Sequence, residues 1–361
     1  MSYAIVQTGA PTAVVNRSIK GFLESMYSED IVFAVGGPDS LVEASFSSVS
    51  PSALDLSRPG SWIGSGRRSM TADDLTIICD NLHKNGVSGL ALIGGNGTMA
   101  LAAALAQEAR IRSLPLRFVG IPKTIDNDLA AINHSPGFPS ASRFLSHVIT
   151  DLGRDHDAMA GVEQVRIIET MGRDTGWLAL AATYHRHDPA FRADLVLIPE
   201  IDFEEQWFLE QVETTLRDRG RALIVTSEGV APHLTNQPVK ERNHTQLIQG
   251  GLARKLAGLV SDSLQVSTRG EVLGTIQRCS SAFIGTRDSR EAEALGYAAG
   301  MWLKGAKPGD STMFGINSDN TVKQFSLEKV ASEVKSVPPH WRTSSLDKLE
   351  DFYDWLEPLL T

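Results

Sequence analysis

Two carboxylates follow a short apolar run in the segment Gly120-Ile-Pro-Lys-Thr-Ile-Asp-Asn-Asp128. Asp126 and Asp128 are two positions apart, so in an extended segment their side chains point to the same side. One carboxylate of such a pair can take a proton from an attacking hydroxyl, while the other holds a Mg²⁺ ion that neutralises phosphate. Lys123 adds a positive charge for a phosphoryl group in transfer. These residue types at this spacing predict a phosphotransferase.

Three short loops contain the small residues that suit phosphate binding. Gly94-Gly-Asn-Gly-Thr98 lies between an apolar run and a helical stretch, and Thr8-Gly-Ala-Pro-Thr12 is a second turn of this kind. Glycine lets the backbone approach an anion, and the following helix offers free N–H groups and a positive dipole. Gly64-Ser-Gly-Arg-Arg68 carries two guanidinium groups that can grip phosphate. One such loop is equally typical of an ordinary tight turn, and a pair of Arg side chains is also typical of a solvated surface. Three such loops together with the acid pair favour phosphate binding.

Charged residues in the second half of the chain suit an acceptor. Arg173, in Met171-Gly-Arg173, follows an apolar strand and is expected to point toward ligand. Glu228 follows another strand and can accept hydrogen bonds from sugar hydroxyls. Arg269 and Arg278 flank the strand-like run Val272-Leu-Gly-Thr-Ile-Gln277, where they can hold the phosphate of an acceptor. A structural salt bridge is the alternative for each residue, since the chain has 34 basic and 43 acidic side chains.

The composition excludes several classes of function. The 361 residues suffice for two domains, and a net charge of −9 gives no basic surface for nucleic acid. The two cysteines, Cys79 and Cys279, lack metal-type spacing and are expected to be reduced thiols. The chain starts without the basic flank and apolar run of a signal peptide, and no stretch is apolar enough to span a membrane. We therefore expect a cytoplasmic enzyme with neither nucleic acid nor membrane as a partner.

Short apolar runs alternate with amphipathic stretches, which predicts an α/β fold with parallel sheets and helices on both faces. Strands are expected at residues 3–6, 31–35, 90–93, 117–120, 164–169, 195–198 and 222–226. Helices are expected at residues 12–26, 71–84, 97–108, 140–150, 176–185, 203–219, 241–260 and 348–360. Thr71-Ala-Asp-Asp74 resembles a capping box, residues 45–61 look like an irregular crossing, and a domain boundary is expected near residues 133–139.

The motifs in combination resemble those of the phosphofructokinases, and within them the pyrophosphate-dependent branch. The resemblance covers residues 4 to about 300. It rests on seven segments: Gly9-Ala-Pro-Thr-Ala-Val-Val-Asn16, Gly64-Ser-Gly-Arg67, Gly94-Gly-Asn-Gly-Thr98, Pro122-Lys-Thr-Ile-Asp-Asn-Asp128, Met171-Gly-Arg173, Ser227-Glu228 and Gly274-Thr-Ile-Gln-Arg278.

The resemblance implies two doubly wound Rossmann-like domains of phosphofructokinase type, with the active site in the cleft between them. Residues 1–134 with about 277–330 would form the larger, donor-phosphate domain. Residues 135–276 with about 331–361 would form the smaller, sugar-phosphate domain.

The resemblance also implies a role for each matching residue. Asp126 would deprotonate the sugar 1-hydroxyl, and Asp128 with Asn96 would act at the metal. The transferring phosphoryl group would be steadied by Lys123, Thr124 and Arg173. The donor site would be lined by Gly9, Arg67, Gly95, Asn96, Gly97 and Thr98. The sugar phosphate would be held by Met171, Gly172, Arg173, Glu228, Arg269 and Arg278, with an arginine of a neighbouring subunit able to contribute.

Four positions depart from the family pattern. Asn96 stands where most relatives carry Asp, so Mg²⁺ would depend more on Asp128 and on the donor phosphates. Gly97 stands where pyrophosphate users often have Asp and leaves room for ATP, whereas Lys123 suits pyrophosphate. On the acceptor side, Thr275 replaces a His that contacts the phosphate in many relatives, and Cys279-Ser280 replaces Gly-Gly.

The expected reaction is the Mg²⁺-dependent transfer of a phosphoryl group from pyrophosphate to the 1-hydroxyl of fructose 6-phosphate. A homodimer or homotetramer is expected from the resemblance. Three alternatives remain open: an ATP-dependent phosphofructokinase, a kinase for another sugar phosphate, which Thr275 suggests, and a non-catalytic sugar-phosphate sensor, which Asn96 suggests.

Overall fold

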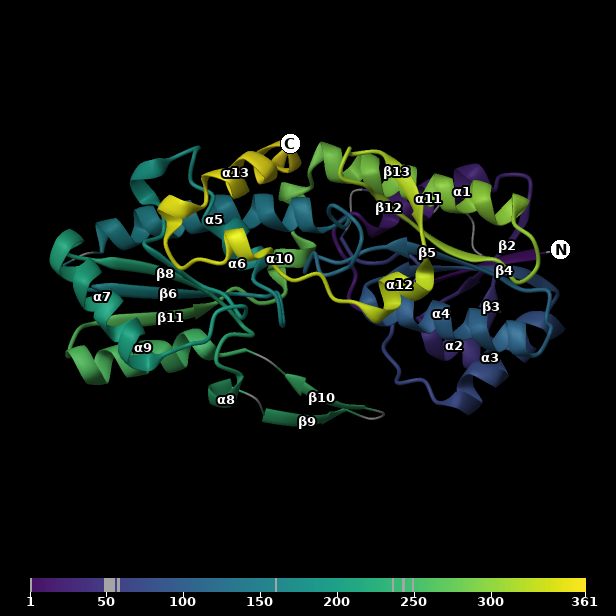
Figure 1. The fold of residues 1–361 in the computed structure, drawn as a ribbon, viewed down its shortest axis with the longest axis horizontal. Coiled ribbons are helices and arrows are strands. Elements are labelled where there is room, and N and C mark those ends of the chain that lie inside the picture. Colours follow the sequence, from purple (N-terminus) through teal and green to yellow (C-terminus); the bar gives the residue numbers. More distant parts are fainter. Residues whose placement is uncertain are drawn as a thin grey trace. The chain divides into compact units, whose positions relative to one another are not determined.

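The structure is a computed structural model that describes residues 2–48, 56, 59–159, 161–235, 237–241, 244–248 and 250–361. Much of the expected crossing at residues 45–61 lies outside this described part of the chain. The fold is a two-unit α/β structure (Figure 1). Unit 1 comprises Met1–Ser140 and Arg278–Lys335, and unit 2 comprises Ala141–Gln277 and Ser336–Thr361. None of the helices in the described part is long and apolar enough to cross a bilayer.

Unit 1 is built on a seven-stranded sheet with the order β13-β12-β5-β4-β1-β2-β3. Its strands are β1 (Ser2–Gln7), β2 (Asp30–Ala34), β3 (Phe46–Ser47), β4 (Val87–Gly94), β5 (Arg117–Pro122), β12 (Ser311–Ile316) and β13 (Val322–Phe325). The five inner strands are parallel, and the two edge strands pair antiparallel. The chain goes from β1 to β2 on one side and continues at β4 on the other. The strand order therefore reverses between β1 and β4, where sheets of this kind bind ligands.

Helices cover both faces of this sheet (Figure 1). One core joins the sheet to α1 (Val15–Ser25) and α11 (Thr286–Gly305). The other joins it to α3 (Ala72–Lys84), α4 (Asn96–Ile111), and the short α2 (Pro38–Val42) and α12 (Leu327–Ser332). Every residue of β1 is buried, as expected for an inner parallel strand.

The start of α3 confirms the capping-box prediction. The Thr71 hydroxyl accepts a hydrogen bond from the Asp74 N–H, and the Asp74 carboxylate accepts one from the Thr71 N–H. Two of the four unpaired N–H groups at this helix start are thereby satisfied locally. Hydrogen bonds from Thr71 lower the pKa of Asp74.

Unit 2 is built on a four-stranded parallel sheet with the order β11-β6-β8-β7. Its strands are β6 (Val165–Thr170), β7 (Leu195–Leu197), β8 (Ala222–Ser227) and β11 (Thr268–Val272). The helices α7 (Glu205–Arg219) and α9 (Leu252–Leu264) pack on one face, against Val165 and Ile167 among others. Side chains alternate along a strand, so Arg166 points to the other face, where it pairs with Asp155 of α5 (Phe138–Ala158).

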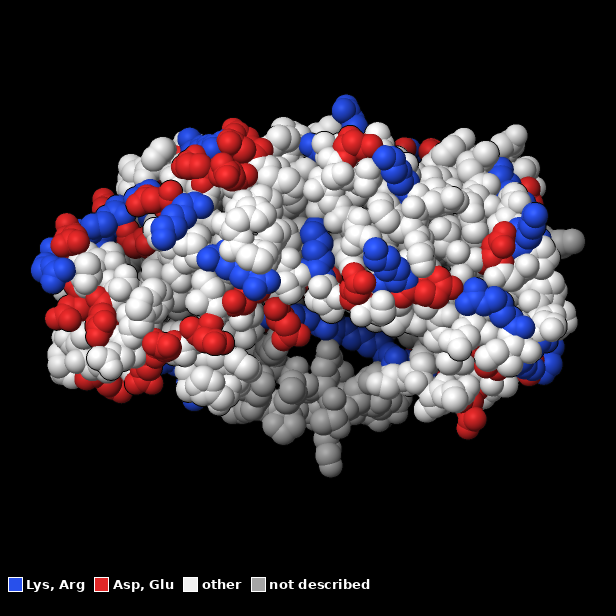
Figure 2. All heavy atoms as spheres, in the orientation of Figure 1, with Lys and Arg blue, Asp and Glu red and all other residues white. Residues whose placement is uncertain are grey.

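The C-terminal segment completes unit 2 with α13 (Glu350–Leu356). Arg186, which follows α6 (Trp177–Ala182), forms ion pairs with Glu350, Asp354 and Glu357. Figure 2 shows a cluster of acidic side chains over α13. Aromatic packing of Trp177 against Trp355 also holds this segment. The helix expected at residues 348–360 is therefore present in part, followed by a 3₁₀ turn at Glu357–Leu360.

Two predicted elements differ from the structure. Of the helix expected at residues 241–260, the part from Leu252 is present as α9, whereas the chain before it forms an antiparallel hairpin of β9 (Gln237–Glu241) and β10 (His244–Ile248). The consecutive Gly250 and Gly251, with φ of +130° and +87°, separate hairpin from helix because only glycine adopts such angles easily. A strand is also expected at residues 272–277. In the structure β11 ends at Val272, and the chain continues into the short helix α10 (Ile276–Cys279).

Candidate active site

The loops after β1, β4 and β5 meet at the point in unit 1 where the strand order reverses. The Gly9 N–H donates to the Gly66 carbonyl at 3.0 Å, so the loops at residues 8–12 and 64–68 lie side by side. The Lys123 N–H donates to the Gly94 carbonyl at 2.9 Å and joins the loop after β5 to the loop after β4. The three phosphate-type loops and the acid pair are thus brought together within one unit, as their chemistry requires.

The loop after β4 depends on glycine for a close approach. A Cβ on Gly94 would lie 1.9 Å from the Thr98 hydroxyl oxygen, so no larger residue fits there. The buried Thr98 hydroxyl is hydrogen bonded to that of Thr8. No side chain in the described part of the chain caps α4, whose N-cap is Gly95, so its first N–H groups can meet an anion.

The acid pair lies on a turn and not on an extended segment. Asn127 has a φ of +53°, and the Asp126 N–H donates to the Thr124 hydroxyl at 3.1 Å. The sequence argument that alternation puts both carboxylates on one side is therefore wrong, because β5 ends at Pro122. Asn tolerates the left-handed region better than most residues, and its side chain accepts the Ser135 N–H at 3.1 Å. The sequence analysis does not single out Asn127, although its place between two acids is a usable signal.

Asn96 connects the glycine loop to the acid pair. Its Nδ2 donates to the Asp128 carboxylate oxygen Oδ2 at 2.6 Å and to the Asp128 carbonyl at 3.1 Å. Its other amide atom, Oδ1, is buried and has no hydrogen-bond partner among the described residues. Carboxylate and amide oxygens are ligands that Mg²⁺ accepts, so the orphaned oxygen beside Asp128 fits a metal ion or its bound water.

The rest of a metal shell would come from the donor. No three His, Cys, Asp or Glu side chains in the described part of the chain lie close enough together to hold a metal ion. Mg²⁺ is often held by one or two protein oxygens together with substrate phosphates and water. Asn96 and Asp128 match that pattern.

Lys123 is buried beside the acid pair and donates from Nζ to the Ala10 carbonyl at 2.5 Å. Burial lowers the pKa of Lys123 to about 7, against the nearby charge of Asp126, which raises it. The charges of Arg67 and Arg278 lower it further. Lys123, Arg67 and Arg278 of unit 1 therefore lie near enough to influence one another electrostatically, and three such cationic groups suit the binding of a polyphosphate.

Two arginines of unit 1, Arg68 and Arg278, differ in their contacts. Arg68 pairs with Asp39 at 2.9 Å and with Asp74 at 2.7 Å, so its role is structural. Arg278 forms no side-chain hydrogen bond or ion pair with any residue that the structure describes. Its guanidinium group is therefore available to an anion.

A second group of predicted residues comes together in unit 2, at the carboxyl ends of β6 and β8. The Arg173 N–H donates to the Glu228 carboxylate at 3.2 Å, and the Glu228 N–H donates to the Thr170 carbonyl at 2.9 Å. Arg173 is exposed and has a φ of +53°, an unusual angle for a non-glycine residue that is often found at binding sites. A Cβ on Gly172 would lie 2.7 Å from the Thr175 carbonyl oxygen, which explains the glycine.

Gln277 is a contributor that the sequence analysis did not identify. Its Oε1 accepts the Met171 N–H at 3.1 Å, although the two residues are 106 positions apart in the chain. It thereby holds the loop that carries Arg173, next in sequence to Arg278.

Arg269 lies away from this second group. It is a residue of β11 opposite Arg166 of β6, and its Nε pairs with Glu163 at 2.6 Å. Glu163 precedes β6, whereas Met171 and Glu228 follow the carboxyl ends of their strands. Arg269 is therefore near the amino end of the sheet and is not brought together with the other sugar-phosphate residues of unit 2.

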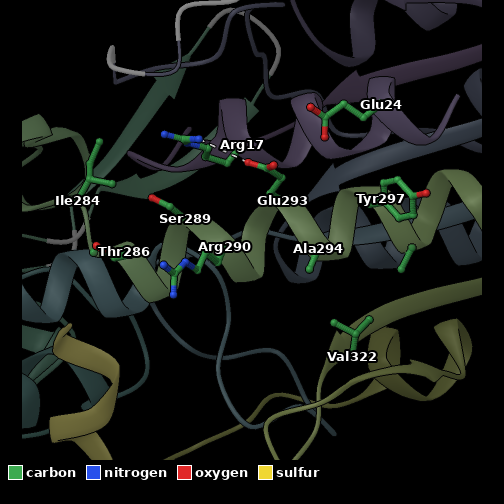
Figure 3. A pocket seen from close by; sticks show the side chains of 12 residues that line it. Arg17, Glu24, Ile284, Thr286, Ser289, Arg290, Glu293, Ala294, Tyr297 and Val322 are labelled. Atoms are coloured by element: carbon green, nitrogen blue, oxygen red, sulfur yellow. Dashed lines mark hydrogen bonds and ion pairs between the residues drawn. The ribbon is translucent and has the colours of Figure 1, made fainter. Parts of the chain in front are cut away.

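Unit 1 also has a cavity of about 860 Å³ that is lined by residues of α1 and α11, by Ile284 and by Val322 of β13 (Figure 3). Arg17, Arg290, Glu293 and Tyr297 are among its lining residues. Arg17 pairs with Glu293 across the two helices at 3.4 Å. None of the twelve lining residues belongs to the predicted site.

Comparisons with known proteins identify the relatives of this chain. The family model for phosphofructokinase matches residues 2–303. The chain is 31% identical to a sulfofructose kinase of Alkalicoccus urumqiensis, over 100% of this chain and 96% of that protein. It is 29% identical to a pyrophosphate–fructose 6-phosphate 1-phosphotransferase of Rhodospirillum rubrum, over 99% and 93% of the two chains. ATP-dependent 6-phosphofructokinases are also among the relatives.

A solved pyrophosphate-dependent phosphofructokinase, that of Marinobacter aquaeolei, superposes with a TM-score of 0.84 and 25% identity, covering 100% of this chain and 91% of that one. The two doubly wound units match its fold. Together with the family match over most of the chain, these findings show that the chain belongs to the phosphofructokinase family.

Proposed function

We propose that this phosphofructokinase-family phosphotransferase transfers a phosphoryl group from pyrophosphate to the 1-hydroxyl of fructose 6-phosphate. The observation that carries the proposal is the hydrogen bond of 2.6 Å between Asn96 and Asp128. This contact fixes the acid pair against the N-terminus of α4, where the backbone is arranged for phosphate. A carboxylate that can act as a base, two side chains whose oxygens can bind a metal ion, and cationic side chains thus lie together in unit 1.

Each group in unit 1 has a role in this transfer. The 1-hydroxyl oxygen bonds to phosphorus while its proton passes to the Asp126 carboxylate, and the bond from phosphorus to the bridging oxygen breaks as phosphate leaves. Bound Mg²⁺, held by Asp128 and Asn96, would neutralise negative charge on the donor. Lys123 and Arg67 stabilise the charge on the phosphate oxygens, and the N–H groups at the start of α4 hold the donor.

The acceptor is assigned to the residues that gather in unit 2, together with Arg278. Glu228 accepts hydrogen bonds from sugar hydroxyls, and Arg173 and Arg278 bind anionic oxygens. Arg269 lies near the opposite end of its own sheet, so we assign it to the acceptor site of a neighbouring copy in a homodimer or homotetramer. This assignment makes activity depend on assembly.

ATP is a second candidate donor, favoured by one specific observation. A Cβ on Gly97 would meet no atom of the described residues within 4 Å, so none of them fills the space beside this helix start. ATP, which is larger than pyrophosphate, fits this space, whereas an Asp side chain at position 97 would crowd it. Initial rates with MgATP and Mg-pyrophosphate decide between the donors, and a kcat/KM that is higher with MgATP would contradict our choice.

Gly97→Asp sharpens the donor comparison. The variant should lose activity with ATP while keeping activity with pyrophosphate, since the new carboxylate repels an additional phosphate. Gly161→Asp is the matched control, because a Cβ there also meets open space away from the site. Ligand binding without turnover from either donor would instead support a sugar-phosphate sensor.

A sulfonate-bearing fructose is a second candidate acceptor. It is favoured by the 31% identity with a sulfofructose kinase over the whole chain, and by the neutral hydroxyl of Thr275. A sulfonate carries one negative charge and a phosphate ester nearly two at pH 7, so a site with fewer cationic groups suits the sulfonate. A panel with fructose 6-phosphate and sulfofructose tests this, and Thr275→His should shift preference toward the phosphate if the sulfonate is native.

A further inference from the structure

The connector of residues 334–337 carries the chain from unit 1 into unit 2 and is attached to predicted site loops in both. Its first contacts are within unit 1. Val334 pairs with Leu129 in an isolated antiparallel bridge, and the Lys335 N–H donates to the Asp128 carbonyl at 2.8 Å. This bridge and this hydrogen bond therefore attach the connector to the chain at and just after the acid pair.

The Lys335 side chain strengthens this attachment. Its Nζ donates to the Asn133 carbonyl and, at 3.4 Å, to the Asn127 side-chain oxygen. Asn127 is the left-handed residue that separates Asp126 from Asp128. A side chain some two hundred positions away thus holds the one residue whose backbone angle sets the directions of both carboxylates.

Two residues further on, the connector is attached within unit 2. The Val337 N–H donates to Glu200 Oε1 at 2.9 Å, and the same oxygen accepts the Gly176 N–H at 3.1 Å. Gly176 ends the loop that carries Arg173 and starts α6. Glu200 therefore joins the connector to the loop of the predicted phosphoryl-binding arginine.

We propose that the connector is a positioning element, in which Lys335 holds the Asp126–Asp128 turn and Val337, through Glu200, holds the Met171–Gly176 loop. The inference rests on the proposed phosphoryl transfer and assigns functions to two residues outside it. Neither Lys335 nor Glu200 needs to touch substrate. Each acts by restricting a loop whose backbone is in an unfavourable conformation and would otherwise relax.

Lys335→Met tests the first attachment, because it removes the donor group and keeps the apolar stem. We expect kcat and the affinity for the Mg²⁺-loaded donor to fall roughly 10- to 100-fold, the range typical of residues that orient metal ligands, with the acceptor KM nearly unchanged. Lys335→Arg retains a donor and should restore most of the loss. Lys304→Met is the matched control, since Lys304 also donates from Nζ to a carbonyl, that of Ser25, but on α11.

Binding of Mg-pyrophosphate and MgATP should be measured by calorimetry as well as by turnover. Weak donor binding in Lys335→Met with strong binding in Lys304→Met supports the inference even if neither predicted acceptor is phosphorylated, so the two proposals can fail separately. Equal binding and equal kcat in wild type and Lys335→Met would overturn it. So would the same losses in Lys304→Met, because a general loss of stability would then explain both.

Glu200 provides the second arm of the experiment. Glu200→Ala should raise the acceptor KM about tenfold and leave donor affinity unchanged, whereas Glu200→Gln keeps an acceptor oxygen and should restore acceptor binding. An effect of Glu200→Ala on donor affinity equal to that on acceptor KM would show that the two attachments are not separate, and would refute the assignment of Glu200.

Discussion

Asp126 and Asp128 differ in surroundings although they are only two residues apart. Asp128 is fixed by the Asn96 amide, whereas the Asp126 N–H closes a local turn with Thr124. A carboxylate that is held by an amide donor suits a metal ligand, and our proposal gives proton transfer to Asp126. The residue between them makes this difference possible, because a left-handed Asn127 turns the chain.

Asp126→Asn should lower kcat by about 10²- to 10⁴-fold, the usual contribution of a general base, with little change in the KM of either substrate. The amide keeps the shape of the side chain but cannot take the proton. Steady-state kinetics check this, with Asp319→Asn as an exposed control. A variant with nearly normal kcat would remove Asp126 from the reaction.

The two thiols should differ in reactivity. Burial raises the pKa of Cys79 to about 12, so on the order of one Cys79 thiol in ten thousand is ionised at pH 8. Cys279 is only partly buried and follows Arg278. A thiol reagent should modify one group in the native protein and two after unfolding, and Cys279→Ser should abolish the native reaction. Rapid native modification of Cys79 would contradict the buried position.

The close backbone contact between α1 and α11 has no clear signal in the sequence. A Cβ on Gly21 would lie 1.9 Å from the Glu293 carbonyl oxygen, and one on Gly296 would lie 2.0 Å from that of Ser18. The two helices therefore approach each other closely at glycines. Together they cover one face of the unit 1 sheet, where they pack on side chains of β1 and β4.

Gly296→Ala should destabilise unit 1 by about 1–3 kcal/mol or more, because the neighbouring atom is backbone and cannot move aside easily. Gly258→Ala on α9 is the matched control: its Cβ would meet no atom of the described residues within 4 Å, so the better helix propensity of Ala should stabilise by up to about 1 kcal/mol. Urea unfolding of both variants measures the difference. Equal stability of the two variants would mean that the helices can separate without cost.

Features that depend on neighbouring residues could be predicted from the sequence, whereas features that depend on contacts between distant residues could not. The Thr71–Asp74 capping box and the buried run of β1 depend on neighbours in sequence, and the structure confirms both. The β9–β10 hairpin runs into the stretch from residue 241 where the sequence predicts helix, because pairing between its strands leaves no clear signal in a short polar stretch. The position of Arg269 depends on which end of the sheet β11 enters, which spacing does not show.

The candidate site was predicted in the same uneven way. Residue types identified the loops of Gly9, Gly94 and Asp126, and the structure brings them together in unit 1. Lys335 and Gln277 could not be identified, because each contacts a loop more than a hundred positions away. Only the fold shows which distant polar side chain meets an orphaned backbone group.

At the scale of the whole molecule, each unit has its own core and its own group of predicted ligand-binding residues. The chain passes between units at residues 140–141, 277–278 and 335–336. The last two passages are next to predicted functional residues, Arg278 and Lys335. The stability of each unit should therefore respond to the ligand that it binds.

A donor at 100 times its Kd should stabilise unit 1 by about 2.7 kcal/mol and unit 2 much less, because a ligand stabilises what it binds. Trp62 and Trp302 belong to unit 1, and the other four tryptophans, Trp177, Trp207, Trp341 and Trp355, belong to unit 2. In a Trp62→Phe/Trp302→Phe variant, fluorescence during urea unfolding reports unit 2 alone, and circular dichroism reports both units. We expect Mg-pyrophosphate to separate the two curves by shifting only the dichroism transition of unit 1. If both curves shift together by the same amount, the two units unfold as one cooperative body, and the separate response argued from their cores is wrong.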